Sequence, residues 1–273
     1  MASSVPTTQV PVSFTEVVEV KSAAGVWTDP MPTALSEQVA FFKDQGFLII
    51  PGVVGERDLE ELDRELNRLA ANYEKLPWIR EGFASEPRTD PNRTTPTFRK
   101  IGGVSELSEA FGRLLRHRRI LDVVHEILGP QLLLYRDVVM MKAARVGREK
   151  PWHQDSVYWP FRPMNLVSAS TALDDATPEN GCLQVIPGTH TREQQHYGKE
   201  LRLDLSDEQQ ARAVYVPLKA GDTLLFHSLV LHASEPNQSD EDRRLCIFAY
   251  MAEGLEYIGK GERPRTPLVS RRQ

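Results

Sequence analysis

From Gln131 onward, short apolar or β-branched runs are separated by Gly, Pro, Asn and Asp, and this pattern limits the folds open to the chain. Many short strands with turn residues between them are typical of a sandwich or a closed barrel. No regular alternation of strands and helices is present, which argues against a doubly wound parallel sheet. The predicted strands are Leu132 to Lys142, Val167 to Leu173, Cys182 to Ile186, Ala213 to Val216, Thr223 to Phe226, Leu229 to Ser234 and Leu245 to Met251.

The residues before Gln131 follow helical patterns. In Leu35 to Gln45 and in Glu56 to Tyr73, apolar residues recur at three- and four-residue steps. Phe47 to Ile50 is expected as a short strand between these helices, and Ser105 to Leu128 as a helix in two pieces. Helices followed by many strands predict an α+β fold, mainly β, in which the helices buttress one side of a jelly roll.

We expect residues 1–273 to form a single domain. Its predicted parts are an extended lead-in over residues 1–32, a helical buttress over 33–130, a jelly-roll core over 131–252 and a tail over 253–273. Hydrophobic residues make up 40% and charged residues 26% of the chain, which is ordinary for a globular protein with a substantial core. The long irregular loop Trp78 to Pro96 is of the kind that is usually functional or mobile.

Charge and cysteine content narrow the classes of partner. The formal net charge is −5, so no general basic character suggests a nucleic-acid partner, and the basic run Arg113 to Arg119 fits a solvated helix face. Cys182 and Cys246 lack the spacing of a disulfide framework or a CxxC site and are expected as buried thiols. No apolar run reaches membrane-spanning length, and no secretory, mitochondrial or peroxisomal address is recognised. A cytoplasmic location without a membrane partner is therefore expected; the oligomeric state is not readable.

The segment Pro151 to Pro163, PWHQDSVYWPFRP, carries the sharpest chemical signal. His153 and Asp155 stand two residues apart, so in an extended backbone their side chains point to the same side. An imidazole and a carboxylate would then converge on one point and need a third ligand from elsewhere in the fold.

His232 is the candidate for that third ligand, and His227 is its competitor. The two lie five residues apart, so a strand would place them on opposite faces. Two histidines and one carboxylate on one side of a metal are the arrangement of non-haem iron(II) oxygenases, although zinc accepts the same ligands.

Arg243, eleven residues after His232, separates the two metals. Its guanidinium can grip a carboxylate with two parallel hydrogen bonds. A 2-oxoglutarate enzyme needs such a clamp for the distal carboxylate of its co-substrate, whereas a zinc hydrolase does not. Arg244 is next in sequence and would point to the opposite face of a strand. Strand alternation alone does not say which of the two arginines points toward the site.

Three segments together resemble the phytanoyl-CoA dioxygenase family: Pro151 to Pro163, PENGCLQVIPGTH (Pro178 to His190), and GDTLLFHSLVLHAS (Gly221 to Ser234) with the following Arg243. The resemblance spans about Leu35 to Met251 and includes helices that end in Gly-Pro before the first long strand. It implies a double-stranded β-helix that uses Fe(II), 2-oxoglutarate and O₂.

By position, the resemblance assigns His153, Asp155 and His232 as iron ligands and Arg243 as the clamp for 2-oxoglutarate. Ser234 matches a hydroxyl that assists the same carboxylate, and Lys100 resembles a lysine that lies near the co-substrate. One departure is visible: family members often carry a Trp in the strand where this chain has Ser170 or Thr171, which implies a different pocket wall.

The predicted function is hydroxylation of a small molecule, such as a specialised metabolite, with release of succinate and CO₂. Related halogenases replace the carboxylate ligand with a small residue, so the presence of Asp155 favours hydroxylation. Desaturation, cyclisation, epimerisation and acyl-CoA hydroxylation are alternatives with the same cofactor chemistry. A metal-holding jelly roll without turnover is the alternative of another class.

Overall fold

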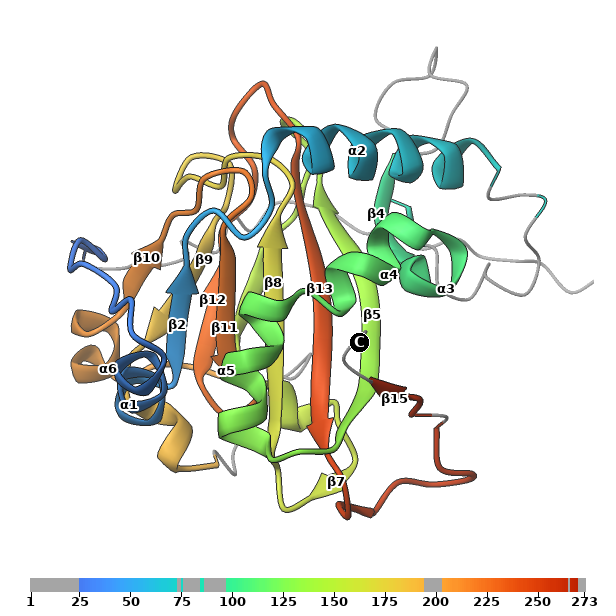
Figure 1. The fold of residues 1–273 in the computed structure, drawn as a ribbon. Coiled ribbons are helices and arrows are strands. Elements are labelled where there is room, and N and C mark those ends of the chain that lie inside the picture. The colour runs from blue at the N-terminus through green and yellow to red at the C-terminus, as the bar shows by residue number, and fades with distance from the viewer. Residues whose placement is uncertain are drawn as a thin grey trace, which may run out of the picture.

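Two sheets face each other, and helices cover the outer side of the larger one (Figure 1). The computed structural model describes residues 25–72, 75, 84–85, 97–193, 203–264 and 266–269. The predictions for residues 1–24, for most of the loop Trp78 to Pro96 and for residues 270–273 lie outside the described residues.

The major sheet has the strand order β2-β11-β8-β13-β5-β4-β3, and β15 also pairs with β5. All its pairs are antiparallel. The strands are β2 (Phe47–Ile50), β3 (Ala84–Ser85), β4 (Phe98–Gly102), β5 (Leu132–Lys142), β8 (Leu166–Ala172), β11 (Thr223–His227), β13 (Arg243–Ala252) and β15 (Leu268–Val269).

The minor sheet has the order β1-β10-β9-β12-β6, in which only β1 pairs in parallel among the described strands. Strands that are distant in the sequence become neighbours in both sheets, as in a jelly roll. The predicted fold class, a mainly β double-stranded β-helix, is confirmed. The minor strands are β1 (Gly25–Val26), β6 (Lys150–His153), β9 (Leu183–Ile186), β10 (Val214–Val216) and β12 (Leu231–Ser234), and β7 (Phe161–Arg162) pairs with β14 (Glu256–Tyr257) apart from them.

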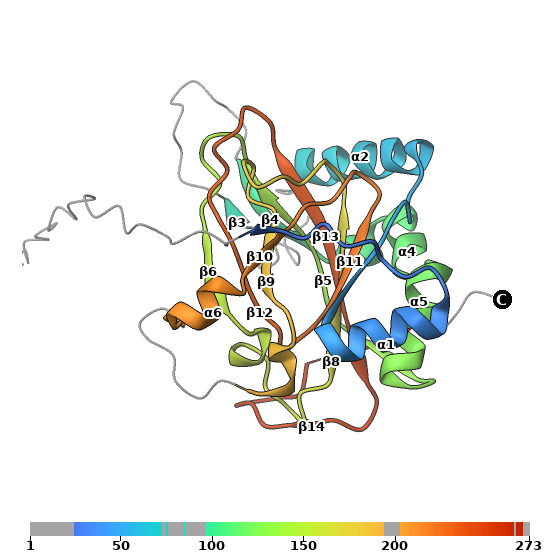
Figure 2. The ribbon, with the colours of Figure 1, turned by 90° about the vertical axis from the view of Figure 1, so that its left-hand side faces the viewer.

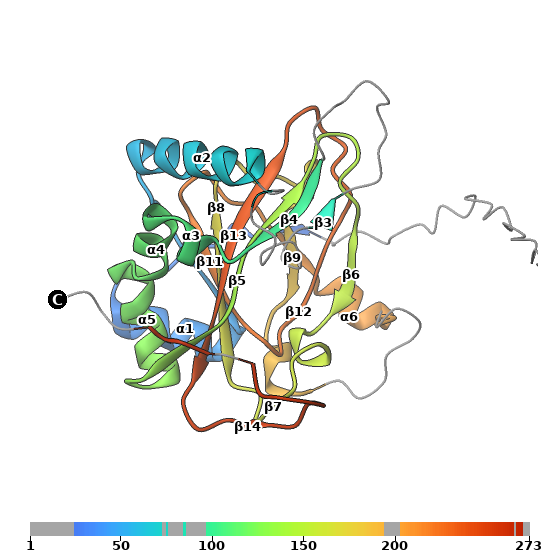
Figure 3. The same ribbon diagram turned by 90° about the vertical axis from the view of Figure 1, so that its right-hand side faces the viewer.

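The helices lie mainly on one face of the major sheet, as Figures 2 and 3 show from opposite sides. None of the described helices is long and apolar enough to cross a membrane. Arg119 ties this layer to the loop after β2, because its guanidinium donates to the carbonyls of Pro51 and Gly52. The helices are α1 (Leu35–Gln45), α2 (Glu56–Ala71), α3 (Val104–Leu107), α4 (Glu109–Leu115), α5 (Arg118–Leu128) and α6 (Asp207–Ala211).

Side-chain alternation along β13 divides the core into two layers. Cys246 and Phe248 face the helices and join the larger apolar cluster, in which the Tyr250 hydroxyl donates to the carbonyl of Leu115 at 2.7 Å. Leu245 faces the space between the sheets and joins a second cluster. β13 is buried on both faces, so the large core forms around it and the site lies on its inner side.

Most predicted strands agree with the structure to within two residues, but three features differ. The helical segment Ser105 to Leu128 forms three helices rather than two, because Ser108 (φ −143°, ψ 128°) and His117 (φ −64°, ψ 126°) are extended. The predicted strand Phe47 to Ile50 is confirmed as β2, and it joins the edge of the major sheet beside β11, so this sheet draws on residues before Gln131. β6 and β4 were not predicted as strands. The division into parts stays a prediction.

Candidate active site

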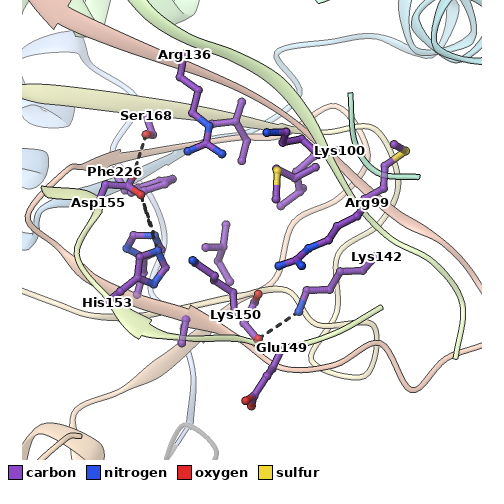
Figure 4. Close-up of a pocket in the computed structure, with 18 of the residues that line it drawn as sticks. Arg99, Lys100, Arg136, Lys142, Glu149, Lys150, His153, Asp155, Ser168 and Phe226 are labelled. Atoms are coloured by element: carbon purple, nitrogen blue, oxygen red, sulfur yellow. Dashed lines mark hydrogen bonds and ion pairs between the residues drawn. The ribbon is translucent and has the colours of Figure 1, made fainter. Parts of the chain in front are cut away.

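His153 and Asp155 project from the end of β6 toward the space between the sheets (Figure 4). The strand ends at His153 and Asp155 begins a short 3-10 turn, but Gln154 between them is extended (φ −108°, ψ 145°). The two side chains therefore still point to the same side. The buried Gln154 amide fixes this turn, because it donates to the carbonyls of Leu229 at 2.6 Å and Arg192 at 2.8 Å.

His232 joins them from the neighbouring strand β12, where it is the direct cross-strand partner of His153. The two imidazole rings lie 4.2 Å apart between centroids. Their Nε2 atoms are 3.8 Å (His153) and 3.9 Å (His232) from Oδ1 of Asp155. All three potential ligand atoms lie within 4.8 Å of one another, and all three residues are buried.

Backbone carbonyls orient both imidazoles. Nδ1 of His153 is 2.7 Å from the carbonyl of Pro151, and Nδ1 of His232 is 3.0 Å from that of Val230. A carbonyl can only accept, so each Nδ1 carries the hydrogen and each Nε2 keeps its lone pair for a metal. Burial, followed by the neighbouring His232 and Lys150, holds the pKa of His153 well below its usual value. His153 is therefore neutral, as a metal ligand must be.

His227 is separated from this cluster. Its Nδ1 accepts from the backbone N–H of Leu229 at 3.1 Å, and its ring lies 5.6 Å from that of His190. Burial and the nearby His190 lower its pKa to about 4. The predicted choice of His232 over His227 agrees with this placement.

Arg243 lies on the inner face at the start of β13, with 4% of its surface exposed. Its Nε has no hydrogen-bond partner among the described residues. Burial lowers its pKa to about 10. A buried guanidinium without an acid is costly, so this position suits an anion that none of the described residues supplies.

Arg244 faces the other way and is fully engaged. It forms ion pairs with Asp174, at 2.6 Å, and with Asp63 of α2. These contacts raise its pKa. Arg244 therefore joins the helical layer to the sheet, and only Arg243 lines the cavity.

Every site residue predicted from the sequence lines one cavity of about 420 Å³. Ser234 follows His232 on the same strand, and Lys100 enters from β4, where it pairs with Met140 of β5. The chemical roles of these residues stay predictions. The predicted residues at the cavity are Lys100, His153, Asp155, His232, Ser234 and Arg243.

The sequence reasoning missed two cations on β5. Lys142 is the cross-strand partner of Arg243, and its ammonium donates to the carbonyls of Ser234 (3.2 Å) and Glu235. Burial and Arg243 lower its pKa to about 6. Arg136 lines the cavity six residues earlier on the same strand. The signal was present, because Arg136 and Lys142 stand at even spacing in a strand whose only other charged residue is Asp137.

The predicted departure in the pocket wall falls at Ser170. Thr171 is turned away, and its hydroxyl lies 2.8 Å from that of Thr223. Ser170 pairs with Ile247, which lines the cavity, and the Ser170 hydroxyl is buried without a partner among the described residues. A small side chain therefore stands where a Trp was expected from the resemblance.

The donor set suits a divalent metal with open positions on its far side. Two imidazole nitrogens and one carboxylate are the ligands of a facial triad, and the unpaired Arg243 suits a dianionic co-substrate. These residues fit iron(II) and 2-oxoglutarate.

Comparison with known proteins gives the same picture. A model of the phytanoyl-CoA dioxygenase family matches residues 42–245. The peroxisomal phytanoyl-CoA dioxygenase of Mus musculus is 31% identical over 224 residues, covering 76% of this chain and 65% of that protein. The methylphosphonate hydroxylase of Gimesia maris is 29% identical, covering 82% of this chain and 84% of that protein. The epimerase SnoN of nogalamycin biosynthesis has a similar fold, with a TM-score of 0.67 at 24% identity over 84% of this chain and 87% of that one.

Proposed function

The chain belongs to the phytanoyl-CoA dioxygenase family and is a non-haem iron, 2-oxoglutarate-dependent dioxygenase, and from that premise we propose that it hydroxylates a small-molecule substrate. Succinate and CO₂ are the products of the co-substrate. The observation that carries the proposal is the convergence of His153, Asp155 and His232 beside the unpaired Arg243.

Each site residue has a role in the proposal. His153, Asp155 and His232 hold the iron through two Nε2 atoms and one carboxylate. Arg243 grips the distal carboxylate of 2-oxoglutarate with two hydrogen bonds, and the Ser234 hydroxyl assists it. Lys100, which lines the same cavity, is assigned to the co-substrate in this proposal. When bound, the iron, 2-oxoglutarate and O₂ supply the oxidising chemistry, and the protein aims it.

Hydroxylation is proposed over halogenation because Asp155 retains the third ligand position. The cavity of about 420 Å³ lies in the lower part of the usual range for ligand sites, ~300–1,000 Å³, which favours a small substrate over an acyl-CoA. An epimerase has a similar fold, so the fold does not choose the reaction outcome. Product analysis distinguishes hydroxylation from desaturation, cyclisation and epimerisation. A single catalytic domain in the cytoplasm remains part of the proposal.

Substitutions of the two candidate histidines, His232 and His227, provide the test. His232→Gln should lose stoichiometric iron binding and 2-oxoglutarate-dependent succinate formation, because one of three ligands is gone. His227→Gln is the matched control and should keep both, since His227 contacts Leu229 and His190 instead. Iron content after dialysis and succinate release over a substrate panel are the measurements. Retention of iron and succinate formation by His232→Gln, or their loss in His227→Gln, would contradict the assignment.

A further inference from the structure

The cavity beside the metal ligands is strongly cationic, and this charge points to the class of substrate. Seven basic side chains and only two acidic ones line it. We propose that the substrate is a small anion whose carboxylate or phosphoryl group is held by Arg136 and Lys150, an inference that rests on the proposed function. The basic residues are Arg99, Lys100, Arg136, Lys142, Arg148, Lys150 and Arg243, and the acidic ones are Glu149 and Asp155.

The iron and the co-substrate do not use up this positive charge. Iron(II), Asp155, the dianionic 2-oxoglutarate and Arg243 together sum to zero charge. Lys100 is assigned to the co-substrate, and Lys142 is bound to backbone carbonyls with a pKa of about 6. Arg148 and Glu149 each have other interactions, so Arg99, Arg136 and Lys150 are the basic side chains that remain. The loaded site thus keeps a surplus of three positive charges for the substrate.

The remaining cations enter the cavity from different strands, as Figure 4 shows. Arg136 reaches in from β5 and Lys150 from β6, while Arg99 stands on β4 at the exposed rim. Both Arg136 and Lys150 line the same cavity as the metal-ligand candidates His153 and Asp155. A group held between them would lie close to the reacting centre.

Lys150 is half-buried and contacts Tyr158 at the cavity mouth. Its ammonium donates to the hydroxyl of Tyr158 at 2.9 Å and lies 4.4 Å from the centre of that ring. Tyr158 also stacks edge-on against His153, with ring centroids 5.6 Å apart. The contact between Lys150 and Tyr158 therefore fixes a positive charge at the metal end of the cavity.

The cations also repel one another. Burial, then Arg136 and Arg99, lower the pKa of Lys100. No carboxylate of the described residues pairs with Lys100, Arg99 or Arg136. Arginine presents a planar fork that matches the oxygens of a carboxylate or a phosphoryl group, so an anion would relieve this repulsion and gain directional hydrogen bonds.

The test uses the anaerobic complex of the whole chain with iron(II) and saturating 2-oxoglutarate, in which the metal and Arg243 are already occupied. Hexanoate, hexylphosphonate and hexanamide are titrated separately by calorimetry, and the charge-transfer absorption of the iron complex is followed in parallel. We expect at least one anion to bind about tenfold or more tightly than the neutral amide, as charge-assisted hydrogen bonds allow. The two anions distinguish a carboxylate site from a phosphoryl site.

Two variants locate the binding. Arg136→Gln should weaken binding of the preferred anion about 10- to 100-fold and leave hexanamide unchanged. Arg64→Gln removes the same charge from the exposed face of α2, where Arg64 only approaches Glu60 at 3.7 Å, and should leave both unchanged. Equal binding of anions and amide, equal effects of the two variants, or no measurable anion binding would each overturn the inference.

Admission of O₂ to the same samples separates this inference from the proposed function. Anion binding that depends on Arg136 without any succinate formation would remove the proposed function and leave the anion site standing. Succinate formation stimulated only by neutral compounds would remove the anion site and leave the proposed function standing.

Discussion

The two adjacent arginines of β13 should respond to the same substitution in opposite ways. Arg243 is buried without an acidic partner among the residues that the structure describes, whereas Arg244 is paired with Asp174 and Asp63. Arg243→Met should therefore abolish tight binding of 2-oxoglutarate and stabilise the ligand-free chain. Arg244→Met should leave 2-oxoglutarate binding unchanged and destabilise the chain.

The magnitude for Arg243 follows from its burial. Removing one partner of a buried, hydrogen-bonded charge pair costs about 2–5 kcal/mol in binding. Each tenfold change in Kd corresponds to about 1.36 kcal/mol, so the Kd for 2-oxoglutarate should increase by a factor between about 30 and several thousand. In the ligand-free chain, the drop in its pKa from 12.5 to about 10 corresponds to about 3 kcal/mol of unfavourable burial. Methionine replaces the stem without the charge, so up to about that amount of stability should be regained.

The magnitude for Arg244 is smaller and has the opposite sign. Its side chain is 20% exposed and that of Asp174 is 24% exposed, so solvent screens their attraction. Breaking a fully buried pair costs about 3–5 kcal/mol, and this partly exposed network should cost about 1–3 kcal/mol.

Urea unfolding without metal or co-substrate measures the change in stability. Calorimetry on the anaerobic iron(II) protein measures the change in 2-oxoglutarate binding. At 2-oxoglutarate equal to 100 times the wild-type Kd, the wild type should gain about 2.7 kcal/mol and Arg243→Met less than about 1 kcal/mol. The reasoning is refuted if Arg243→Met binds 2-oxoglutarate within threefold of wild type, or if it destabilises the ligand-free chain as Arg244→Met does.

Three further substitutions test the electrostatics and packing around the site. Burial lowers the pKa of Lys142 to about 6, so above that pH the unfolded chain binds one more proton than the folded chain, and stability rises with pH. Lys142→Met should reduce the slope of this rise by up to about 1.4 kcal/mol per pH unit, measured by urea unfolding between pH 7 and 9. The pKa of His227 is lowered to about 4, and its Nδ1 accepts a hydrogen bond from the backbone N–H of Leu229, so stability is lost as pH falls from about 6.5 toward 4. Between pH 7 and 4.5, the wild type should lose about 2 kcal/mol more unfolding free energy than His227→Gln. Tyr250→Phe strands the carbonyl of Leu115 and should cost about 1–3 kcal/mol of stability, with the Kd for 2-oxoglutarate unchanged.

The strands and the metal-ligand candidates could be predicted because their signals are local. Turn residues bound the short apolar runs, and the spacing of His153 and Asp155 needs only an extended residue between them, which Gln154 supplies. The pairing of His232 with His153 was not readable, since it depends on which strands become neighbours across the minor sheet. The same holds for β4, which carries Lys100 into the cavity through its pairing with β5.

The cationic lining escaped prediction for a related reason. Arg136 and Lys142 share one face of β5, but β5 has a cavity on one side and apolar packing on the other, so its sequence alone does not say which side is hollow. Lys142 also needs room made by residues far from it in the chain. At Gly181 (φ 79°), an added Cβ would lie 2.3 Å from the carbonyl oxygen of Glu235 and 3.1 Å from the Lys142 ammonium. Such a fit is a property of the assembled barrel.

The choice between Arg243 and Arg244 shows why geometry was needed to interpret the chemistry. β13 is apolar on both faces, since Leu245 lies between the sheets and Cys246 lies against the helices, so hydrophobic alternation assigns neither arginine to the cavity. The partners make the assignment. Arg244 finds its acids within the chain, at Asp174 and Asp63, whereas the cross-strand partner of Arg243 is a second basic residue, Lys142. Burial and Arg243 lower the pKa of Lys142 to about 6, so at neutral pH the guanidinium of Arg243 is the charge that stays buried, and such a charge is costly unless an anion compensates it. No described residue supplies that anion, and the distal carboxylate of 2-oxoglutarate is the group that the neighbouring metal ligands would bring there.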